Sequence, residues 1–203
     1  DINSVDKFSI GYWHNCAILD NGNLNCWGRN NYGQLGDGTT STRTSPVLID
    51  INNVLNIGIG DYHTCAVIDD GTVKCWGLNN YGQLGNGTTD NSLTPVDVNN
   101  INNAVDVSLG TTYTCALLEN DNLKCWGKNM HSILGEYNDY YSNVPVDLNI
   151  PNINQITTGN EHNCVLYNDG NVGCWGYNWK YQLGIYEKNY EEVPIIIDVP
   201  KLS

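Results

Sequence analysis

The chain has few basic residues and almost no methionine or phenylalanine. Nine Lys plus Arg stand against 22 Asp plus Glu, which gives a formal net charge of −13 over 203 residues. A surface with this balance repels phosphate backbones and anionic lipids, so we expect no nucleic acid partner. The sequence also lacks any run of apolar residues long enough to cross a bilayer, and we expect no insertion into a membrane.

The familiar signatures of catalysis are missing as well. There is no HExxH zinc motif, no GxSxG nucleophile turn, no phosphate-binding loop and no CxxC redox pair. Each of these patterns places a nucleophile, a base or a ligand at a spacing that its chemistry requires. We therefore expect no catalytic residues, no cofactor and no enzymatic activity.

What the sequence does contain is a fourfold repeat. A tryptophan follows a cysteine at Trp27, Trp76, Trp126 and Trp175, at spacings of 49, 50 and 49 residues. A repeat of this length indicates an array or a propeller. We predict one propeller-type array whose repeats cover approximately residues 1–49, 50–99, 100–148 and 149–203.

Each repeat holds four short apolar segments and no sustained helical period. The last segment of each repeat follows a proline, at Pro46, Pro95, Pro145 and Pro194. Short segments separated by Gly, Pro and Asn are typical of strands joined by turns. The sequence therefore predicts an all-β fold of propeller blades, with four antiparallel strands in each blade and no substantial helix.

The eight cysteines form four pairs, and the members of every pair are ten residues apart. In the second repeat, a three-residue turn at Asp69-Asp70-Gly71 would pair Ile68 with Thr72 and set the two cysteines directly opposite each other. Opposed strand residues have Cα atoms about 4.5–5.5 Å apart, within the range of a disulfide. The third repeat has Glu119-Asn120-Asp121 at the turn, without glycine, so a different turn is open there. The pairs are Cys16 with Cys26, Cys65 with Cys75, Cys115 with Cys125, and Cys164 with Cys174.

Two alternatives compete with disulfides. Buried free thiols are the usual state in a reducing cytosol. Zinc could use His63 with Cys65 and Cys75, but the third repeat has Tyr113 in place of the histidine and no fourth ligand recurs. We favour four disulfides and no metal, and hence an extracellular location, secreted or at the cell surface. The sequon Asn86-Gly87-Thr88 permits glycosylation at Asn86.

Three histidines, His14, His63 and His162, occupy equivalent places in their repeats. We interpret them as structural, with a ring nitrogen tying adjacent strands or blades together. The four repeated tryptophans are interpreted as blade-packing residues. His131 has no counterpart, and we predict a loop residue without an acidic partner.

Binding residues are sought where one repeat departs from the others, because packing demands should be common to all four. Aromatic residues gather in the divergent loops of the third and fourth repeats, where their rings suit contact with a protein or glycan surface. The alternative is that they pack against one another or cap the array. Trp13, beside Tyr12, is another aromatic without a counterpart. The candidate binding residues are Tyr137, Tyr140, Tyr141, Trp179, Tyr181, Tyr186 and Tyr190.

Four segments of the second repeat form a recognisable pattern: Gly60-x-x-His63-x-Cys65-Ala66, Gly71-Thr72-Val73, Cys75-Trp76-Gly77-x-Asn79 and Tyr81-Gly82-Gln83-Leu84-Gly85. The repeat that contains them resembles that of the regulator-of-chromosome-condensation family, and its paired cysteines resemble the secreted, alpha-tubulin-suppressor-like branch. The resemblance implies a propeller of four-stranded blades, usually seven in a ring. With four repeats, we expect assembly with other copies of the chain or with further repeats.

From these features we predict a secreted, disulfide-linked module that acts as a non-catalytic binding or self-assembling structural protein. Its expected partners are a protein or glycan surface and other copies of itself. A secreted inhibitor of an enzyme is the alternative, since the resemblance extends to a secreted propeller of that kind. Guanine-nucleotide exchange is less favoured, because the acidity and the cysteine pairs count against it.

Overall fold

The computed structural model describes residues 4–135, 139–186 and 188–197. Over these residues the chain is all-β, apart from one 3-10 turn at Met130–Ser132, and forms four antiparallel sheets of four strands in chain order. The predicted fold class is confirmed. The first two sheets contain β1 (Val5–Ile10), β2 (His14–Leu19), β3 (Leu24–Gly28), β4 (Arg43–Ile49), β5 (Val54–Ile59), β6 (His63–Ile68), β7 (Val73–Gly77) and β8 (Ser92–Asp97). The last two contain β9 (Ala104–Leu109), β10 (Tyr113–Leu118), β11 (Leu123–Lys128), β12 (Tyr141–Asp147), β13 (Ile153–Thr158), β14 (His162–Tyr167), β15 (Val172–Tyr177) and β16 (Tyr190–Ile197).

A three-residue turn joins the two middle strands of each blade. In the second blade, the Ile68 N–H donates to Thr72 O at 2.9 Å and Gly71 adopts a φ of +78°. A Cβ at Gly71 would lie 2.6 Å from Asn102 O, so glycine meets a need for space as well as for positive φ. In the third blade, Asp121 takes φ 60° and the same turn hydrogen bonds form, so this turn does not differ from the others.

The register of this hairpin places each pair of cysteines directly opposite, as predicted. All four disulfides form, with Cα atoms 4.1 Å apart in each. The distance is slightly shorter than expected for an opposed pair. Because the sulfur atoms are bonded to each other, no thiolate remains for the zinc or free-thiol alternatives, and no cysteine of the described chain is free.

The fourth strand of each blade forms its outer edge and contains a proline. β4, for example, begins at Arg43, three residues before Pro46, so the strand starts earlier than the sequence pattern predicts. Proline has no N–H to donate and is tolerated where a strand has a neighbour on one side only. Proline in the same place in β8, β12 and β16 helps to keep these edges from pairing with another chain.

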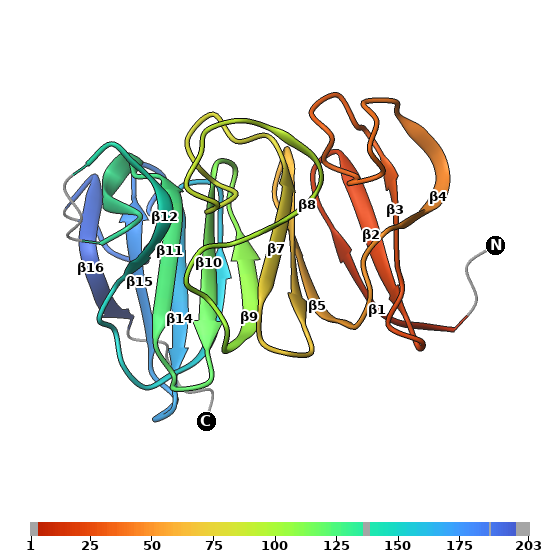
Figure 1. Cartoon of the computed structure of the whole chain (residues 1–203). Coiled ribbons are helices and arrows are strands. Elements are labelled where there is room, and N and C mark those ends of the chain that lie inside the picture. The colour runs from red at the N-terminus through yellow and green to blue at the C-terminus, as the bar shows by residue number, and fades with distance from the viewer. Residues whose placement is uncertain (1–3, 136–138, 187, 198–203) are drawn as a thin grey trace.

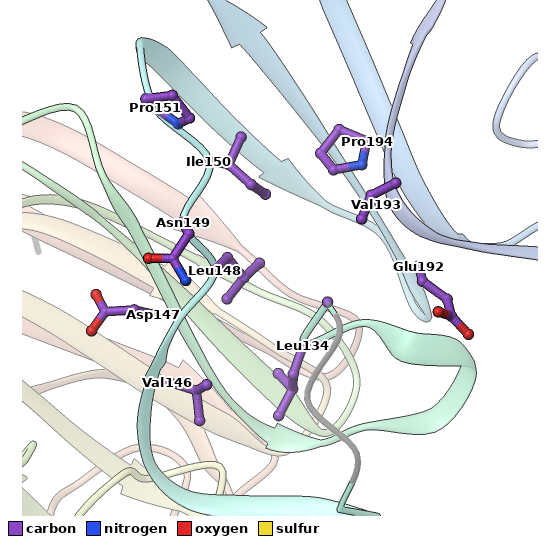
Figure 2. Close-up of a pocket in the computed structure, with 11 residues that line it drawn as sticks. Leu134, Val146, Asp147, Leu148, Asn149, Ile150, Pro151, Glu192, Val193 and Pro194 are labelled. Atoms are coloured by element: carbon purple, nitrogen blue, oxygen red, sulfur yellow. The ribbon is translucent and has the colours of Figure 1, made fainter.

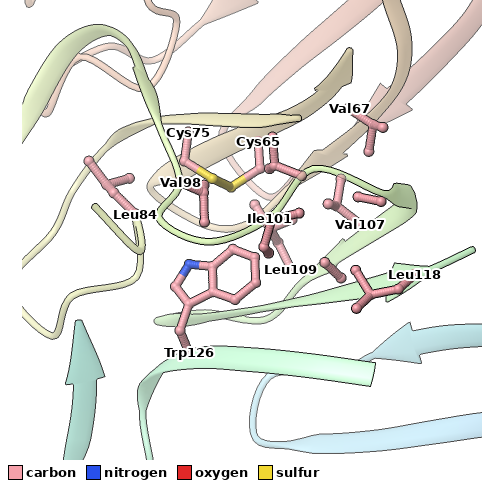
Figure 3. Close-up of a cluster of buried hydrophobic side chains, with 13 residues drawn as sticks. Cys65, Val67, Cys75, Leu84, Val98, Ile101, Val107, Leu109, Leu118 and Trp126 are labelled. Atoms are coloured by element: carbon pink, nitrogen blue, oxygen red, sulfur yellow. A yellow bond between two sulfur atoms is a disulfide. The ribbon is translucent and has the colours of Figure 1, made fainter. Parts of the chain in front are cut away.

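Blades pack face to face, and each internal contact buries one cluster of apolar side chains. Between the second and third blades, Trp126 points toward the Cys65–Cys75 disulfide, with Val98 and Ile101 beside it (Figure 3). Trp76 and Trp175 fill the corresponding places at the other two contacts, and all three indoles are fully buried. The predicted packing role is confirmed for these three tryptophans.

The four blades stand side by side in chain order, with the first and the fourth at opposite ends (Figure 1). The first strands of neighbouring blades are in contact, as with β5 and both β1 and β9. They form the inner side of the arc, and the proline-containing strands form its rim. No helix in the described part of the chain is long and apolar enough to cross a membrane.

Candidate binding face

The long loops of all four blades lie at one end of the strands. In the first blade, β2 begins at His14 and β3 ends at Gly28, and these two residues are paired in the sheet. The turn before His14 and the loop after Gly28 are therefore neighbours, and the same register recurs in every blade. We call this end, shown at the top of Figure 1, the loop face.

One backbone hydrogen bond per blade places two variable side chains together on the loop face. The Arg29 N–H donates to Trp13 O at 3.0 Å. The equivalent bonds run from Leu78 to Tyr62, from Lys128 to Thr112 and from Tyr177 to Glu161. The backbone thus holds the same two positions of each blade in contact, while the side chains at these positions differ from blade to blade.

Two cations of the loop face lie against pairs of aromatic rings. The Arg29 guanidinium is 4.9 Å from the ring centroid of Trp13 and 5.8 Å from that of Tyr62, which belongs to the next blade. The Lys128 ammonium is 5.0 Å from Tyr81 and 5.9 Å from Tyr140. Each cation is held by the electrostatic attraction between its charge and the ring faces. These pairs span the first three blades.

A separate aromatic group lies on the fourth blade and against His131 of the third. His131 lies 4.6 Å from the Tyr177 ring, and Trp179 stacks on Tyr177 at 6.4 Å. Tyr181 and Tyr186 stack at 5.1 Å with nearly parallel rings. Tyr186 is 84% exposed and Trp179 is 63% exposed, so these rings present large apolar surfaces to solvent.

His131 has an acidic neighbour, contrary to the prediction from sequence. Its Nδ1 atom lies 3.6 Å from Glu161 Oε2, which allows an ion pair but is too long for a hydrogen bond. Glu161 lies in the β13–β14 turn of the next blade, some 30 residues further along the chain. Because this contact forms only when the third and fourth blades pack together, the residues next to His131 in the sequence could not predict it.

The predicted binding residues fall into two groups on the structure. Tyr140 belongs to the Lys128 pair, and Tyr141, at the start of β12, is exposed beside it. Trp179, Tyr181, Tyr186 and Tyr190 belong to the fourth blade, where Tyr190 lies 6.3 Å from His131. Tyr137 lies outside the described residues. Some rings contact one another, as the packing alternative requires, but they remain largely exposed.

Sequence reasoning missed the two cations, Arg29 and Lys128, and the rings of Tyr62 and Tyr81 that lie against them. Tyr81 belongs to a motif that recurs as Asn31-Tyr32-Gly33-Gln34 and Asn80-Tyr81-Gly82-Gln83, so its sequence gives no sign of a special role. Arg29 and Lys128 occupy one equivalent position after Trp-Gly, and Trp13 and Tyr62 occupy another. Comparing these columns between repeats would have found them, because they vary while their neighbours do not.

Glycine-rich turns line a hollow on the inner side of the loop face. The turns around Gly11, Gly60, Gly110 and Gly159 border a space of about 350 Å³. An adjoining hollow of about 640 Å³ includes Glu161 and His162. A Cβ at Gly60 would lie 2.7 Å from Gly110 O, so the inner turns approach one another closely. Asp61 borders both hollows, which makes the inner side of the face acidic.

A separate hollow opens at the rim between the third and fourth blades (Figure 2). It encloses about 550 Å³ and is bordered by Leu148, Ile150, Val193 and Pro194. At the first contact, the equivalent Ile49 and Ile51 are buried, whereas Leu148 and Ile150 are half-buried. The third contact is therefore less completely packed at its rim.

The loops that contain Asp37 and Asn86 are held by internal hydrogen bonds. Burial alone would raise the pKa of Asp37, but hydrogen bonds from Thr39, Arg43 and Asn30 outweigh it and hold the pKa below its ordinary value. Asn86 accepts from the Thr88 N–H at 3.1 Å and from its hydroxyl at 2.9 Å. Both side chains therefore have structural partners, and the sequon lies in this half-exposed loop. Within the described residues, no group of three His, Cys, Asp or Glu side chains is placed to hold a metal ion.

Comparison with known proteins places the chain in one family. The family model described as "Regulator of chromosome condensation (RCC1) repeat" matches residues 21–67 and 70–117, and a second model of that description matches residues 5–34, 54–83, 104–131 and 153–182. Together the matches cover well over half of the chain.

Solved structures of similar fold agree with this assignment. Human WBSCR16 superposes with a TM-score of 0.89 at 24% identity over 98% of this chain and 55% of its own. Yeast RCC1 (Prp20) bound to Kap60 gives 0.85 at 21% over 96% and 49%, and the ectodomain of the Physcomitrella patens receptor kinase CR4 gives 0.55 at 20% over 87% and 40%. The chain spans about half the length of the first two, and identities this low support the fold alone. On the family matches, the chain belongs to the regulator of chromosome condensation (RCC1) repeat family.

Proposed function

We propose that the chain is an extracellular, non-catalytic RCC1-type module that binds a protein through its loop face. The observation that carries the proposal is the placement of Arg29 and Lys128 between aromatic rings contributed by neighbouring blades. Aromatic and arginine side chains are the residue types that dominate protein interfaces.

Several findings support the extracellular location and the non-catalytic role that we propose. Four disulfides are typical of an oxidising compartment, and they favour the secreted branch of the family. Among its described residues, the loop face holds stacked rings and one long His131–Glu161 pair, and no nucleophile is placed against a base. Yeast Prp20 has been solved in complex with Kap60 and is studied for its binding to Gsp1p and histones. A propeller of similar fold therefore binds other proteins through its surface.

A protein partner is favoured over a glycan because the rings of the first three blades are paired around cations. A glycan-stacking platform needs a ring face free for the sugar, whereas the cation-bearing pairs offer edges and charge to a side chain or carboxylate. The self-assembling part of the proposed function rests on the end blades.

The test is a selection of ligands from a random displayed peptide library, using the wild-type chain as bait. The variant Arg29→Ala/Lys128→Ala should weaken binding of the selected peptides by about tenfold or more, since it removes both cations that lie against the paired rings. The matched control is Lys74→Ala/Lys124→Ala, which removes the same charge from strand residues paired with Asp97 and Asp147. Peptides affected equally by both variants, or ligands found only on a glycan array, would overturn the proposal.

A further inference from the structure

The three internal contacts between blades share one hydrogen-bond arrangement, which we call the joint. At the first joint, His14 Nε2 lies 2.7 Å from Thr64 Oγ1, and the Thr64 hydroxyl donates to Gln34 O at 2.7 Å. The Trp76 indole N–H donates to the same carbonyl at 3.0 Å. Since the hydroxyl hydrogen is used on Gln34, the Thr64 oxygen must accept from a protonated Nε2 of His14. One blade supplies the ring and the carbonyl, and the next supplies the hydroxyl and the indole.

The second joint repeats this arrangement atom for atom. His63 Nε2 lies 2.9 Å from Thr114 Oγ1, the Thr114 hydroxyl donates to Gln83 O at 2.9 Å, and the Trp126 N–H donates to the same oxygen at 2.9 Å. The histidines therefore tie blades together, as the sequence predicted for this position.

The third joint keeps the arrangement with different side chains. The Tyr113 hydroxyl lies 2.9 Å from Asn163 Oδ1 and also 2.9 Å from His162 O, so its one hydrogen is shared between the side chain and the backbone of the next blade. The Asn163 amide donates to Ile133 O at 3.1 Å. The Trp175 N–H donates to Ile133 O at 3.0 Å. An asparagine can thus replace the threonine, because its amide offers both the acceptor and the donor that the joint requires.

The two ends of the described chain carry the two unused halves of this joint. On the fourth blade, His162 occupies the ring position and Gln182 the carbonyl position. On the first blade, Asn15 occupies the amide position and Trp27 the indole position. None of these four groups makes its joint hydrogen bond in the described structure, and His162, Asn15 and Trp27 are only partly buried.

The apolar surroundings of the two halves are exposed in the same way. On the first blade, Phe8 is 72% exposed, whereas Ile57 at the equivalent position of the second blade is 6% exposed. On the fourth blade, Leu166 and Val172 are half-buried, whereas the equivalent Val67 and Val73 are 0% exposed. These two faces lie at opposite ends of the arc, so one copy cannot bring them together (Figure 1).

We infer that the fourth blade of one copy binds the first blade of a second copy through a fourth joint of the same kind. The His162 ring N–H donates to the Asn15 amide oxygen, and the Asn15 amide and the Trp27 indole both donate to Gln182 O. The pair of His162 with Asn15 is chemically complete, since the third joint shows that an asparagine serves in this position. The inference rests only on the self-assembling part of the proposed function and does not involve the loop face.

Two such joints between two copies use all four end faces. A head-to-tail contact that closes on itself leaves no face exposed, whereas one that does not close builds a fibre. We therefore expect a closed pair.

Sedimentation of the oxidised 203-residue chain over a wide concentration range tests the inference. The expected species has twice the monomer mass of 22.5 kDa and grows no further. Phe8→Glu should raise the dissociation constant by about tenfold or more, because it places a charge in a buried contact. Phe8 is largely exposed in a single copy, so folding of the monomer should survive. The matched control is Val105→Glu, an exposed position on the inner strand of the third blade, away from both end faces.

A pair of complementary variants separates the joint from a general loss of association. Lysine at Phe8 in one chain and glutamate at Leu166 in another should each prevent self-association. Mixing Phe8→Lys with Leu166→Glu should restore the dimer, because one joint gains an ion pair and the other keeps wild-type residues. Trp27→Phe should weaken the dimer without changing the unfolding of the monomer.

Three outcomes would overturn the inference. A monomer at every concentration would leave these faces to further repeats of a longer polypeptide. Growth beyond the dimer would contradict closure. A dimer that survives Phe8→Glu but is lost on Arg29→Ala/Lys128→Ala would place self-association on the loop face. Loss of peptide binding without any change in mass would instead bear on the loop-face proposal alone.

Discussion

At the scale of single residues, two neutral histidines are built into the joints between blades. Burial lowers the pKa of His14 to about 4, and burial together with the nearby His14 lowers the pKa of His63 to about 3. Each ring must donate from Nε2 to a threonine oxygen, and neither Nδ1 has a hydrogen-bond partner in the described structure. A proton on Nδ1 would therefore be buried without an acceptor.

We predict that acid destabilises the fold through these two residues. The unfolded chain binds a proton at each histidine below about pH 6.5, whereas the folded chain does so only near pH 4 and 3. The folded state thus binds fewer protons in this window, so stability is fully present above about pH 6.5 and falls as the pH is lowered toward the folded values. At about 1.4 kcal/mol per pKa unit, the full loss should be about 3 kcal/mol for His14 and about 5 kcal/mol for His63. Urea unfolding at a series of pH values measures it.

The third joint supplies the matched variant for this prediction. His63→Tyr with Thr114→Asn copies the Tyr113–Asn163 pair and removes one titrating group. The pH dependence should then shrink by about half at unchanged stability near neutral pH. His131→Asn is the control, since His131 takes part in no joint. A pH profile identical to that of the wild type in the double variant would contradict the assignment to His63.

At the scale of secondary-structure elements, the cysteine hairpin is the unit that is repeated. The three-residue turn sets the register, the register sets the cysteines opposite each other, and the disulfide then faces the next blade. Cys65 and Cys75 are both fully buried at the second joint, whereas Cys164, on the open face of the fourth blade, is only partly buried. The same bond therefore lies in two environments.

We predict that the internal disulfide contributes more to stability than the terminal one. Closing a loop this short stabilises by about 3 kcal/mol on the chain-entropy model, and this part is equal for both pairs. Cys65→Ala/Cys75→Ala should cost roughly 1 kcal/mol more than Cys164→Ala/Cys174→Ala, because it also leaves a cavity beside Trp126. Denaturant unfolding in the Phe8→Glu background compares them without self-association. Equal losses would show that packing around the disulfide contributes nothing.

The same element accounts for the state of the cysteines. Under denaturing, non-reducing conditions, the native protein should expose no thiol to a titrating reagent, since all eight cysteines are paired. Reactive thiols in protein taken from its natural source would contradict the extracellular location.

At the scale of the whole molecule, net charge opposes the association of copies. Each chain carries −13, and the end faces that we expect to pair are largely apolar. Long-range repulsion therefore acts against a short-range apolar contact. Salt shortens the range of the repulsion from about 30 Å at 0.01 M to about 8 Å at 0.15 M.

We predict that the dimer tightens as salt is raised through this range. Screening weakens the repulsion between two acidic chains, while burial of apolar side chains is little affected. Sedimentation at several NaCl concentrations measures the dissociation constant, and it should fall by at least a few-fold. An association that weakens with salt would indicate ion pairs across the contact and would contradict an apolar joint.

Much of the fold could be predicted because the same sequence pattern occurs in four copies, and each copy supports the same assignment of strands and turns. The blade, its strand order, the hairpin register and the four disulfides follow from local spacing around residues such as Gly71 and Cys75. The turn at Asp121 was left open, because an aspartate at positive φ leaves no distinct mark in the sequence. The loop-face pairs around Arg29 and Lys128 were missed, because one ring of each pair comes from a neighbouring blade.

By itself, the sequence determined the elements whose partners lie within one repeat: the strands, the turn and the disulfide that joins two strands of one hairpin. Only the tertiary structure decided what lies between repeats, namely the hydrogen bond from His14 to Thr64, the burial of Trp76 and the partial exposure of Trp27. The physical reason is that stacking joins residues about 50 positions apart, and each blade contributes only half of a joint. Identical motifs therefore become buried contacts inside the arc and unpaired faces at its ends.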